Sequence, residues 1–156
     1  MMREHKYRAW DKKDKKWFEP TYRAYDGIVL VKYWEDLVIS LNGRLGLHTM
    51  QGLMDESLFP DRFELVEYTG LKDKNNSGDE LYDKDILNVG DGYCGDHFER
   101  GGNFIIEWNE DAWMVQDAKG EYKMGLWEAV YNRSAQHIGN IYENPELLEE
   151  VSCQKE

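Results

Sequence analysis

Short stretches of alternating apolar and polar residues dominate the chain, and each has the length of a short β-strand. In the first of them, residues 6–10, side chains alternate between two faces, and the apolar pattern resumes at Trp17 and Phe18 after a polar turn. Residues 5–19 therefore predict a β-hairpin, which Pro20 ends or places at the edge of a sheet.

The pattern is less regular between residues 28 and 59. Residues 28–41 contain β-branched and aromatic side chains, and we expect two strands there. Asn42 and Gly43 predict a turn. Residues 45–59, which contain several glycines and precede Pro60, predict a partly helical connection.

The pattern becomes clearer after residue 61. We expect a polar loop at residues 73–79, a glycine-rich loop at 90–102 and one or two helical turns at 126–131. The strands that we expect are residues 62–68, 81–82, 85–89, 103–108, 112–116 and 135–142. Asn144 and Pro145 end the last strand. Short strands at such close spacing favour a mainly β fold with minor helix, a small barrel or a sandwich, over a βαβ fold.

The predicted elements divide into two regions and a tail. We expect an N-terminal β region at residues 1–60 that contains the basic first hairpin, a small barrel-like β region at 61–148, and a C-terminal tail at 149–156. A chain of 156 residues and 18.4 kDa fits one ordinary domain or two very small ones. We therefore do not expect a large multidomain enzyme.

Charge is acidic overall and unevenly distributed. Nineteen Lys and Arg residues against 31 Asp and Glu residues give a net charge of -12, which disfavours general binding to phosphate backbones or anionic lipid surfaces. Residues 1–23, however, contain eight basic and four acidic groups. We interpret this basic segment as complementary to acidic groups of the same molecule or of another subunit, with a DNA-binding arm as the alternative.

The cysteines and the apolar runs indicate a compartment. Cys94 and Cys153 give no disulfide framework, so we expect a reducing environment. The N-terminal residues lack the apolar segment of a secretory signal. The longest apolar runs, such as residues 28–31, have four residues, whereas a membrane-spanning helix needs about 20. The expectation is a cytoplasmic protein that makes no membrane contact.

Four segments resemble a known protein family. They are residues 3–11 (REHKYRAWD), 68–75 (YTGLKDKN), 81–86 (LYDKDI) and 138–148 (IGNIYENPELL). These segments and their order are similar to those of the YopX family of phage and prophage proteins. The resemblance implies a largely β protein encoded by a bacteriophage or prophage, with no established biochemical activity and no catalytic residues to assign.

The turn-forming residues in these segments have a structural interpretation. Thr69-Gly70 and Gly139-Asn140 permit turns, bulges or left-handed backbone, and Asn144-Pro145 stops a strand, so we interpret all three as fold-specifying. Two connections depart from the family's pattern, because residues 76–78 lengthen one loop and residues 91–102 are longer than a strand connection requires.

The most reactive-looking cluster is Cys94, Asp96 and His97, which places a thiol, a carboxylate and an imidazole within four residues. A cysteine nucleophile needs a nearby base to become a thiolate. Because the fold, and not adjacency in the sequence, assembles catalytic partners, we do not interpret this cluster as a catalytic dyad.

Two further sets of residues are candidates for a metal site. The first set combines thiols with imidazoles and consists of Cys94 and His97 with His137 or Cys153. The second set consists of carboxylates, those of Glu107, Glu110 and Asp111. The first lacks the paired ligand spacing of structural zinc sites. The second lacks the spacing of a calcium-binding loop, and an ordinary solvated turn explains it. We expect no metal and no cofactor.

Nucleotide binding and base stacking receive little support. Gly90-Asp91-Gly92 lies outside any GxxxxGK[ST] sequence, and its aspartate repels phosphate. In an acidic protein we interpret the tryptophans as core and subunit-interface residues and not as platforms for bases. The six tryptophans are Trp10, Trp17, Trp34, Trp108, Trp113 and Trp127.

These features rank four functions. We expect a non-enzymatic phage or prophage accessory protein that self-associates and acts through contacts with a host or phage protein. An acidic modulator that imitates DNA is the second hypothesis, and it requires a contiguous acidic surface. The third is a nucleic-acid-binding module that uses Lys12, Lys13, Lys15 and Lys16 of the basic segment. An enzyme ranks fourth, because no convincing catalytic set is present.

Overall fold

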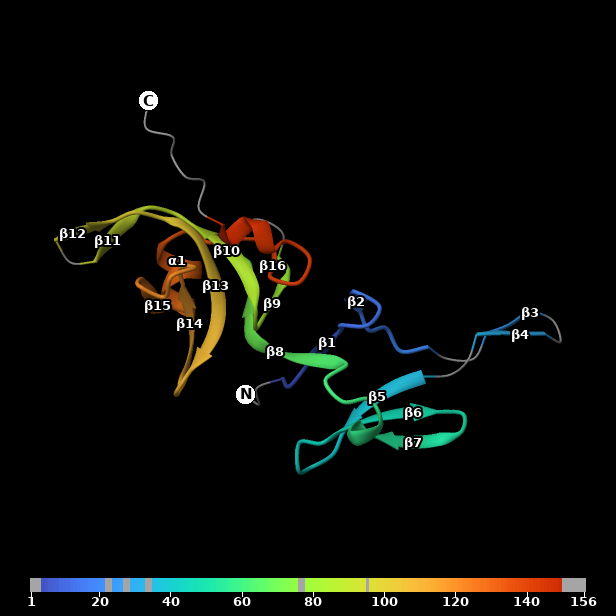
Figure 1. The fold of residues 1–156 in the computed structure, drawn as a ribbon. Coiled ribbons are helices and arrows are strands. Elements are labelled where there is room, and N and C mark those ends of the chain that lie inside the picture. The colour runs from blue at the N-terminus through green and yellow to red at the C-terminus, as the bar shows by residue number, and fades with distance from the viewer. Residues whose placement is uncertain are drawn as a thin grey trace. The chain divides into compact units, whose positions relative to one another are not determined.

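A computed structural model describes residues 4–21, 24–26, 29–32, 35–75, 78–94 and 96–149. The fold is mainly β, with antiparallel sheets that include one curled into a half-barrel, and this confirms the predicted fold class. The chain forms two compact units, one made of Arg8–Leu65 and the other of the residues on either side of that segment (Figure 1). In the described part of the chain, no helix has the length and hydropathy to span a membrane.

The Arg8–Leu65 unit consists of short antiparallel pairings. The predicted first hairpin is confirmed, and the following residues form a second hairpin and a three-stranded sheet. The elements are β1 (Tyr7–Asp11) with β2 (Lys16–Trp17), β3 (Ala24–Asp26) with β4 (Val29–Lys32), and β5 (Glu35–Ile39), β6 (Leu45–Thr49) and β7 (Gly52–Asp55), followed by the 3-10 turn η1 (Glu56–Leu58).

The prediction of a partly helical connection at residues 45–59 holds only for the 3-10 turn η1, because most of this segment is the β6–β7 hairpin. Leu45 and Leu47 are buried on one face of β6. Gly46 between them pairs with Val38 of β5 and leaves room for Leu53 of β7. This is the two-residue period of a strand, which the glycines of the segment obscure in the sequence.

The second unit contains a five-stranded antiparallel sheet, and Figure 1 shows its longest strand, β13, as strongly curved. The strand order is β15 (Lys123–Gly125), β14 (Ala112–Gln116), β13 (Gly102–Asn109), β10 (Asp85–Val89) and β16 (Gln136–Asn140). The remaining elements are β8 (Phe63–Lys72), of which this unit contains the part from Val66, β9 (Glu80–Tyr82), β11 (Gly92–Cys94), β12 (His97–Glu99), α1 (Leu126–Asn132) and η2 (Pro145–Leu148).

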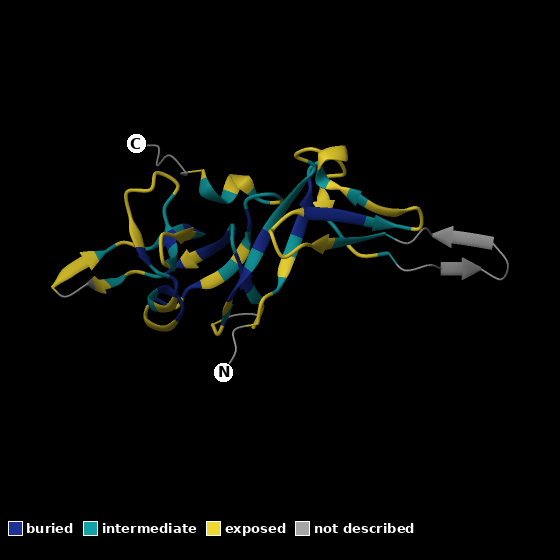
Figure 2. Ribbon diagram, turned by 90° about the horizontal axis from the view of Figure 1, so that it is seen from below, coloured by how far each residue is buried: buried dark blue, intermediate teal, exposed yellow. Residues whose placement is uncertain are grey.

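The glycine-rich segment at 90–102 is more than the loop that the sequence predicts. It contains the β11–β12 hairpin, in which Tyr93 pairs with Phe98 and Cys94 with His97. Figure 2 shows this hairpin as largely exposed. Strands of three residues are too short to produce a recognisable alternation, and this is why the sequence does not reveal them.

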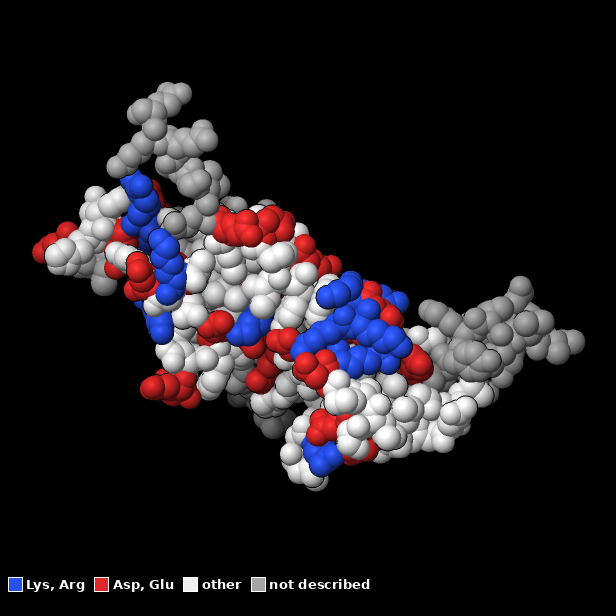
Figure 3. Space-filling view, in the orientation of Figure 1, with Lys and Arg blue, Asp and Glu red and all other residues white. Residues whose placement is uncertain are grey.

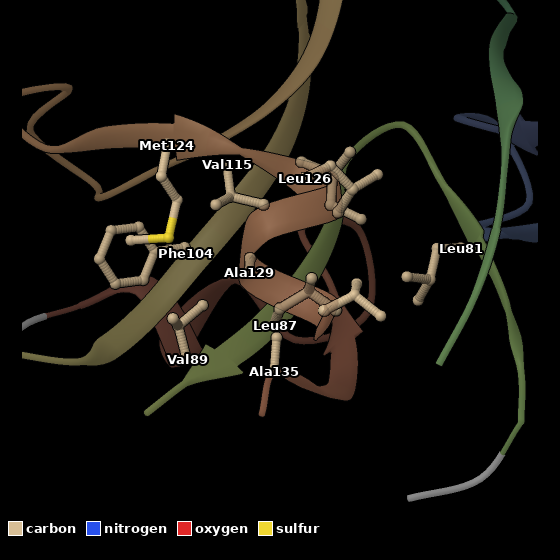
Figure 4. Packing of buried hydrophobic residues seen from close by; sticks show 11 residues of the cluster. Leu81, Leu87, Val89, Phe104, Val115, Met124, Leu126, Ala129 and Ala135 are labelled. Atoms are coloured by element: carbon tan, nitrogen blue, oxygen red, sulfur yellow. The ribbon is translucent and has the colours of Figure 1, made fainter. Parts of the chain in front are cut away.

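The core of the second unit packs the curved sheet against α1 (Figure 4). The helix buries one face, with Leu126, Ala129 and Val130 at the spacing of successive turns. Burial of a Leu or Val side chain contributes about 1.5–3 kcal/mol. The buried cluster consists of Leu81, Leu87, Val89, Phe104, Ile106, Val115, Met124, Leu126, Ala129, Val130 and Ala135. Because the helix buries only this face, other residues of α1 face solvent.

Candidate functional site

The Cys94, Asp96 and His97 cluster lies at the tip of the β11–β12 hairpin. Cys94 pairs with His97 along the backbone, and both Asp96 and His97 are exposed. The side chain of Cys94 and the whole of Cys153 lie outside the described structure. Exposed groups at a hairpin tip lack the surrounding packing that positions catalytic side chains, so the described residues add no support for a dyad.

The candidate metal ligands are not assembled. Among the described residues, no group of three or more His, Cys, Asp or Glu side chains could hold a metal ion. Glu107 accepts a hydrogen bond from Lys84 Nζ at 2.8 Å and another from Gln116 Nε2. Glu110 and Asp111 are exposed in the β13–β14 turn. The acidic set is therefore a solvated turn beside a carboxylate that is already paired.

The glycines of Gly90-Asp91-Gly92 make room for a buried arginine. Arg133 donates from Nε to the Gly90 carbonyl at 3.0 Å, from Nη1 to Glu99 Oε2 at 2.9 Å and from Nη2 to the Glu99 carbonyl at 3.2 Å. A Cβ atom at Gly92 would lie 2.4 Å from Arg133 Nε. The glycines thus accommodate a side chain of the protein itself, which explains them without a bound phosphate.

His137 on β16 lies between two carboxylates. Its Nδ1 is 3.4 Å from Asp79 Oδ2, and its Nε2 is 3.6 Å from Oδ2 of the fully buried Asp85. The backbone N–H of His137 donates to Asp73 Oδ2 at 2.8 Å. The interaction with Asp85 raises the pKa of His137 above its ordinary value, although burial acts in the opposite direction and Asp79 adds a smaller increase.

We expect the free energy of unfolding to decrease as the pH rises through the pKa of His137 in the folded protein. Because this pKa is raised, the imidazolium–carboxylate interactions are fully present below about pH 6.5 and are lost at higher pH. Urea unfolding at about pH 6 and about pH 8 measures the difference. His137→Gln should reduce that difference, and an undiminished difference in the variant would contradict the assignment.

The lysines of the basic segment differ in their pairing. Lys6 Nζ donates to Glu80 Oε1 at 2.6 Å, and Lys12 Nζ donates to Asp61 Oδ1 at 2.7 Å. These contacts agree with the interpretation that the segment complements acidic groups of the same molecule. Within the described residues, three exposed lysines of the β1–β2 turn and the start of β2 form no ion pair, and they are Lys13, Lys15 and Lys16.

The described tryptophans are distributed between core and surface. Trp10 is buried, and the half-buried Trp113 packs against the core of the second unit. Trp17 is half-buried, whereas Trp108 and Trp127 are exposed. Trp34 lies outside the described residues. The predicted core role is thus confirmed for Trp10 and Trp113, and two exposed indoles need another explanation.

Trp127 and Tyr131 form an exposed aromatic pair one turn apart on α1. Their rings stack, with centroids 4.7 Å apart and planes 16° apart, and the residues are 57% and 41% exposed. The Nζ of Lys74 lies 4.2 Å from the centroid of the Tyr131 ring, within the range of a cation–π contact. The i, i+4 spacing of the two residues is the signal in the sequence that could have revealed this pair.

A second exposed aromatic pair lies on the β11–β12 hairpin. Tyr93 and Phe98 are register partners, and their rings meet edge to face with centroids 5.4 Å apart. Both side chains are more than half exposed. Exposed aromatic side chains of this unit therefore form two mutually packed pairs, one on α1 and one on the β11–β12 hairpin.

Comparison with known proteins places the chain in a family. The model of the YopX protein family matches residues 6–149. The chain belongs to the YopX family. None of the curated proteins matches it.

Two solved structures are similar to this YopX family member. Protein EF1440 from Enterococcus faecalis has 24% sequence identity and a TM-score of 0.54, with 93% of this chain and 98% of that chain covered. Protein YopX from Bacillus subtilis has 20% identity and a TM-score of 0.50, with 95% of this chain and 100% of that chain covered. At these identities the likeness shows the fold alone.

The glycines that carried the family resemblance lie at strand irregularities. The β8–β9 pairing shifts between Tyr68 and Lys72, where Gly70 has a left-handed φ of 88°. The β10–β16 pairing shifts between Ile86 and Leu87, opposite the segment that contains Gly139. These β-bulges agree with the interpretation of the glycine dipeptides as fold-specifying.

Two polar residues of the same family segment fix the loop that precedes β9. Asp73 is buried and accepts N–H groups of Asn75 and His137, each at 2.8 Å. The side-chain nitrogen of Asn75 donates to the carbonyls of Val130 at 2.8 Å and Ala135 at 2.9 Å, and so satisfies acceptors at the end of α1. The segment therefore has a structural role in this YopX family member.

Proposed function

We propose that this YopX family member is a non-enzymatic accessory protein of a phage or prophage that acts by binding another protein. The stacked Trp127–Tyr131 pair is the observation that carries the proposal. Tyr and Trp are enriched in protein interfaces and in their energetic hot spots, because they bury a large area and lose little conformational entropy. The Tyr93–Phe98 pair supports the same proposal.

The charge of the second unit favours a protein partner over a nucleic acid for these aromatic pairs. The unit contains 10 basic and 21 acidic residues, whereas the Arg8–Leu65 unit contains 9 and 10. An excess of carboxylates repels phosphate and weakens base stacking by nearby aromatic rings.

Imitation of DNA is a weaker proposal for the same acidic charge. It requires a contiguous acidic surface, but on the face in Figure 3 the Asp and Glu side chains form separate groups among uncharged and basic residues. A charge pattern of this kind matches a phosphate backbone less well than a continuous stripe does. Contact through exposed aromatic side chains therefore ranks first.

We expect the double variant Trp127→Ala/Tyr131→Ala to retain its partner at least about tenfold less well than the native protein, as for loss of an interface hot spot. The tagged full chain is incubated with nuclease-treated lysate of its bacterial host, and bound proteins are identified and quantified. Tyr122→Ala is the matched control, because it removes an aromatic side chain of similar exposure, 44%, from another part of the same unit.

The outcomes separate the rival functions. Equal retention of one protein by both variants would contradict the role of the α1 pair. A partner that is captured only without nuclease would replace the proposal with nucleic-acid binding. Light scattering of the purified chain shows whether the partner is a second copy of the protein, in which case the double variant should shift the mass toward the monomer.

A further inference from the structure

The turn between β1 and β2 presents its lysines on a fixed backbone. Asp11 Oδ1 accepts the N–H of Lys13 at 3.0 Å and the N–H of Asp14 at 3.3 Å, and the N–H of Lys15 donates to the Asp11 carbonyl at 2.8 Å. Lys15 has a left-handed φ of 55° that closes the turn. The buried carboxylate of Asp11 therefore organises the basic turn from inside.

Three carboxylates near the basic turn, those of Asp11, Asp14 and Asp61, lie beside cations other than the three exposed lysines. Arg62 binds Asp11 through two hydrogen bonds, Nε to Oδ1 at 3.2 Å and Nη2 to Oδ2 at 2.7 Å, and its Nη2 lies 3.8 Å from Asp14 Oδ2. Burial alone would raise the pKa of Asp11, but Arg62 and the turn N–H groups hold this pKa below its usual value, so the carboxylate is ionised. Lys12 forms a single hydrogen bond to the exposed Asp61.

Three lysines of this region remain exposed and, in the described structure, without an ion pair. Lys13, Lys15 and Lys16 form no ion pair within the described residues, and Figure 3 shows basic side chains gathered as one area over β1 and β2. At physiological salt, charges more than about 8 Å apart are largely screened from one another. The attraction of this turn for an anion therefore depends on the lysines themselves more than on the overall charge.

A hollow of about 470 Å³ adjoins the basic turn within the same unit. Lys13, Asp61 and Arg62 line its polar side. Its apolar lining comes from β6, β7 and the segment around η1, and consists of Leu47, Met54, Leu58, Phe59 and Pro60. Leu58 is 67% exposed. The hollow is within the size range of ligand pockets, about 300–1,000 Å³, and can accept a bulky apolar side chain.

The combination of lysines with a mainly aliphatic hollow favours one class of partner. A phosphodiester backbone would use the lysines, but its bases stack on aromatic faces, and Phe59 is the one aromatic residue among the described residues that line the hollow. A polypeptide can satisfy both features at once, with carboxylates on the lysines and an apolar side chain in the hollow.

We propose that the β1–β2 turn and the adjoining hollow bind an acidic segment of a partner protein. One bulky apolar residue of this segment inserts into the hollow between Lys13 and Leu58. The Asp or Glu residues of the segment pair with Lys13, Lys15 and Lys16. This inference rests on the proposed function, because it names the chemistry of the protein partner. It assigns that chemistry to the Arg8–Leu65 unit and not to the aromatic pairs.

Fluorescence anisotropy with labelled peptides tests the inference on the full chain. The probe is a short peptide with a central Leu flanked by Glu and Ser residues, and a second peptide replaces that Leu by Ser. Lys13→Glu/Lys15→Glu/Lys16→Glu should weaken binding of the Leu peptide at least about tenfold, because attraction becomes repulsion. The matched control is Lys72→Glu/Arg100→Glu/Lys123→Glu, which changes three exposed cations of the other unit. Its net charge equals that of the lysine variant.

The hollow has its own variant. Leu58→Ser changes an exposed side chain, so the fold should survive, and it should weaken the Leu peptide several-fold while leaving the Ser peptide unchanged. Three outcomes would overturn the inference. The Leu peptide binds the native protein and the lysine variant equally, it does not bind the native protein at all, or an oligothymidylate binds more tightly than the peptide.

The same variants keep failure of this inference distinct from failure of the proposed function. If the lysine variant still captures the partner of the native protein from lysate and the peptide does not bind, the inference is wrong and protein binding through the α1 pair stands. If the peptide binds as expected and the α1 double variant loses no partner, the inference stands and the role of the aromatic pair is wrong.

Discussion

Replacement of Arg133 by alanine is expected to lower the free energy of unfolding by about 3 kcal/mol. Arg133 is only 4% exposed, and its guanidinium joins the end of β10 to β12 through Gly90 and Glu99. Removal of the guanidinium leaves the Gly90 and Glu99 acceptors without these donors. It also leaves the Glu99 carboxylate, which is largely covered, without its cation.

Urea unfolding measures this loss, and hydrogen exchange localises it. Exchange should become faster in β11, β12 and the residues that follow α1, since these are the segments that Arg133 connects. Arg100→Ala is the matched control, because Arg100 is exposed and its loss should change stability by less than about 0.5 kcal/mol. A stability loss for Arg133→Ala as small as that of the control would show that the buried arginine is not a structural clamp.

The elements that the sequence predicts well are those in which several alternating residues are buried together. In β13, Phe104, Ile105 and Ile106 are all buried, but only the alternate residues Phe104 and Ile106 belong to the main core cluster. The facing strand β14 has Val115 buried between half-buried neighbours. Helix α1 is predicted correctly because its apolar residues follow the helical period. In each case the local pattern and the tertiary packing require the same structure.

Elements are missed where the decisive contacts join residues far apart in the sequence. The β11–β12 hairpin consists of two three-residue strands, and the residue that fixes its base, Arg133, comes 34 positions after Glu99. The sequence shows the glycines of this region but not the side chain that they accommodate. The same limit explains why Gly90-Asp91-Gly92 raised the question of a phosphate site.

The candidate binding surfaces also depend on contacts between residues far apart in the sequence. An excess of lysines at residues 12–16 is visible in the composition of the first hairpin, but the sequence does not show that Lys12 is paired and Lys13 is not. That distinction depends on Asp61, which lies 49 positions later. The apolar hollow beside Lys13 also depends on β6 and β7, which were predicted to be partly helical.

Gly101→Ala is expected to destabilise the second unit by about 3 kcal/mol. A Cβ atom at this position would lie 2.1 Å from the Val89 carbonyl oxygen, 2.6 Å from the Gly90 carbonyl carbon and 2.8 Å from the Asp91 nitrogen. All three atoms belong to the backbone, so no side-chain rotation can relieve the overlap. Relief requires separation of the chain at the end of β10 from the start of β13, where Val89 pairs with Gly102.

Gly102→Ala is the matched control for this prediction. The added Cβ atom at Gly102 would meet only Phe104 Cε2, at 3.9 Å, which is an ordinary van der Waals contact, so we expect a change within about 1 kcal/mol. Urea unfolding of the two variants beside the native protein measures the contrast. The two neighbouring residues undergo the same chemical change. A large loss of stability for Gly101→Ala alone would therefore show that the close approach of two backbone segments requires glycine in this loop, and that phosphate binding or chain flexibility does not. Equal stability of the two variants would contradict that explanation.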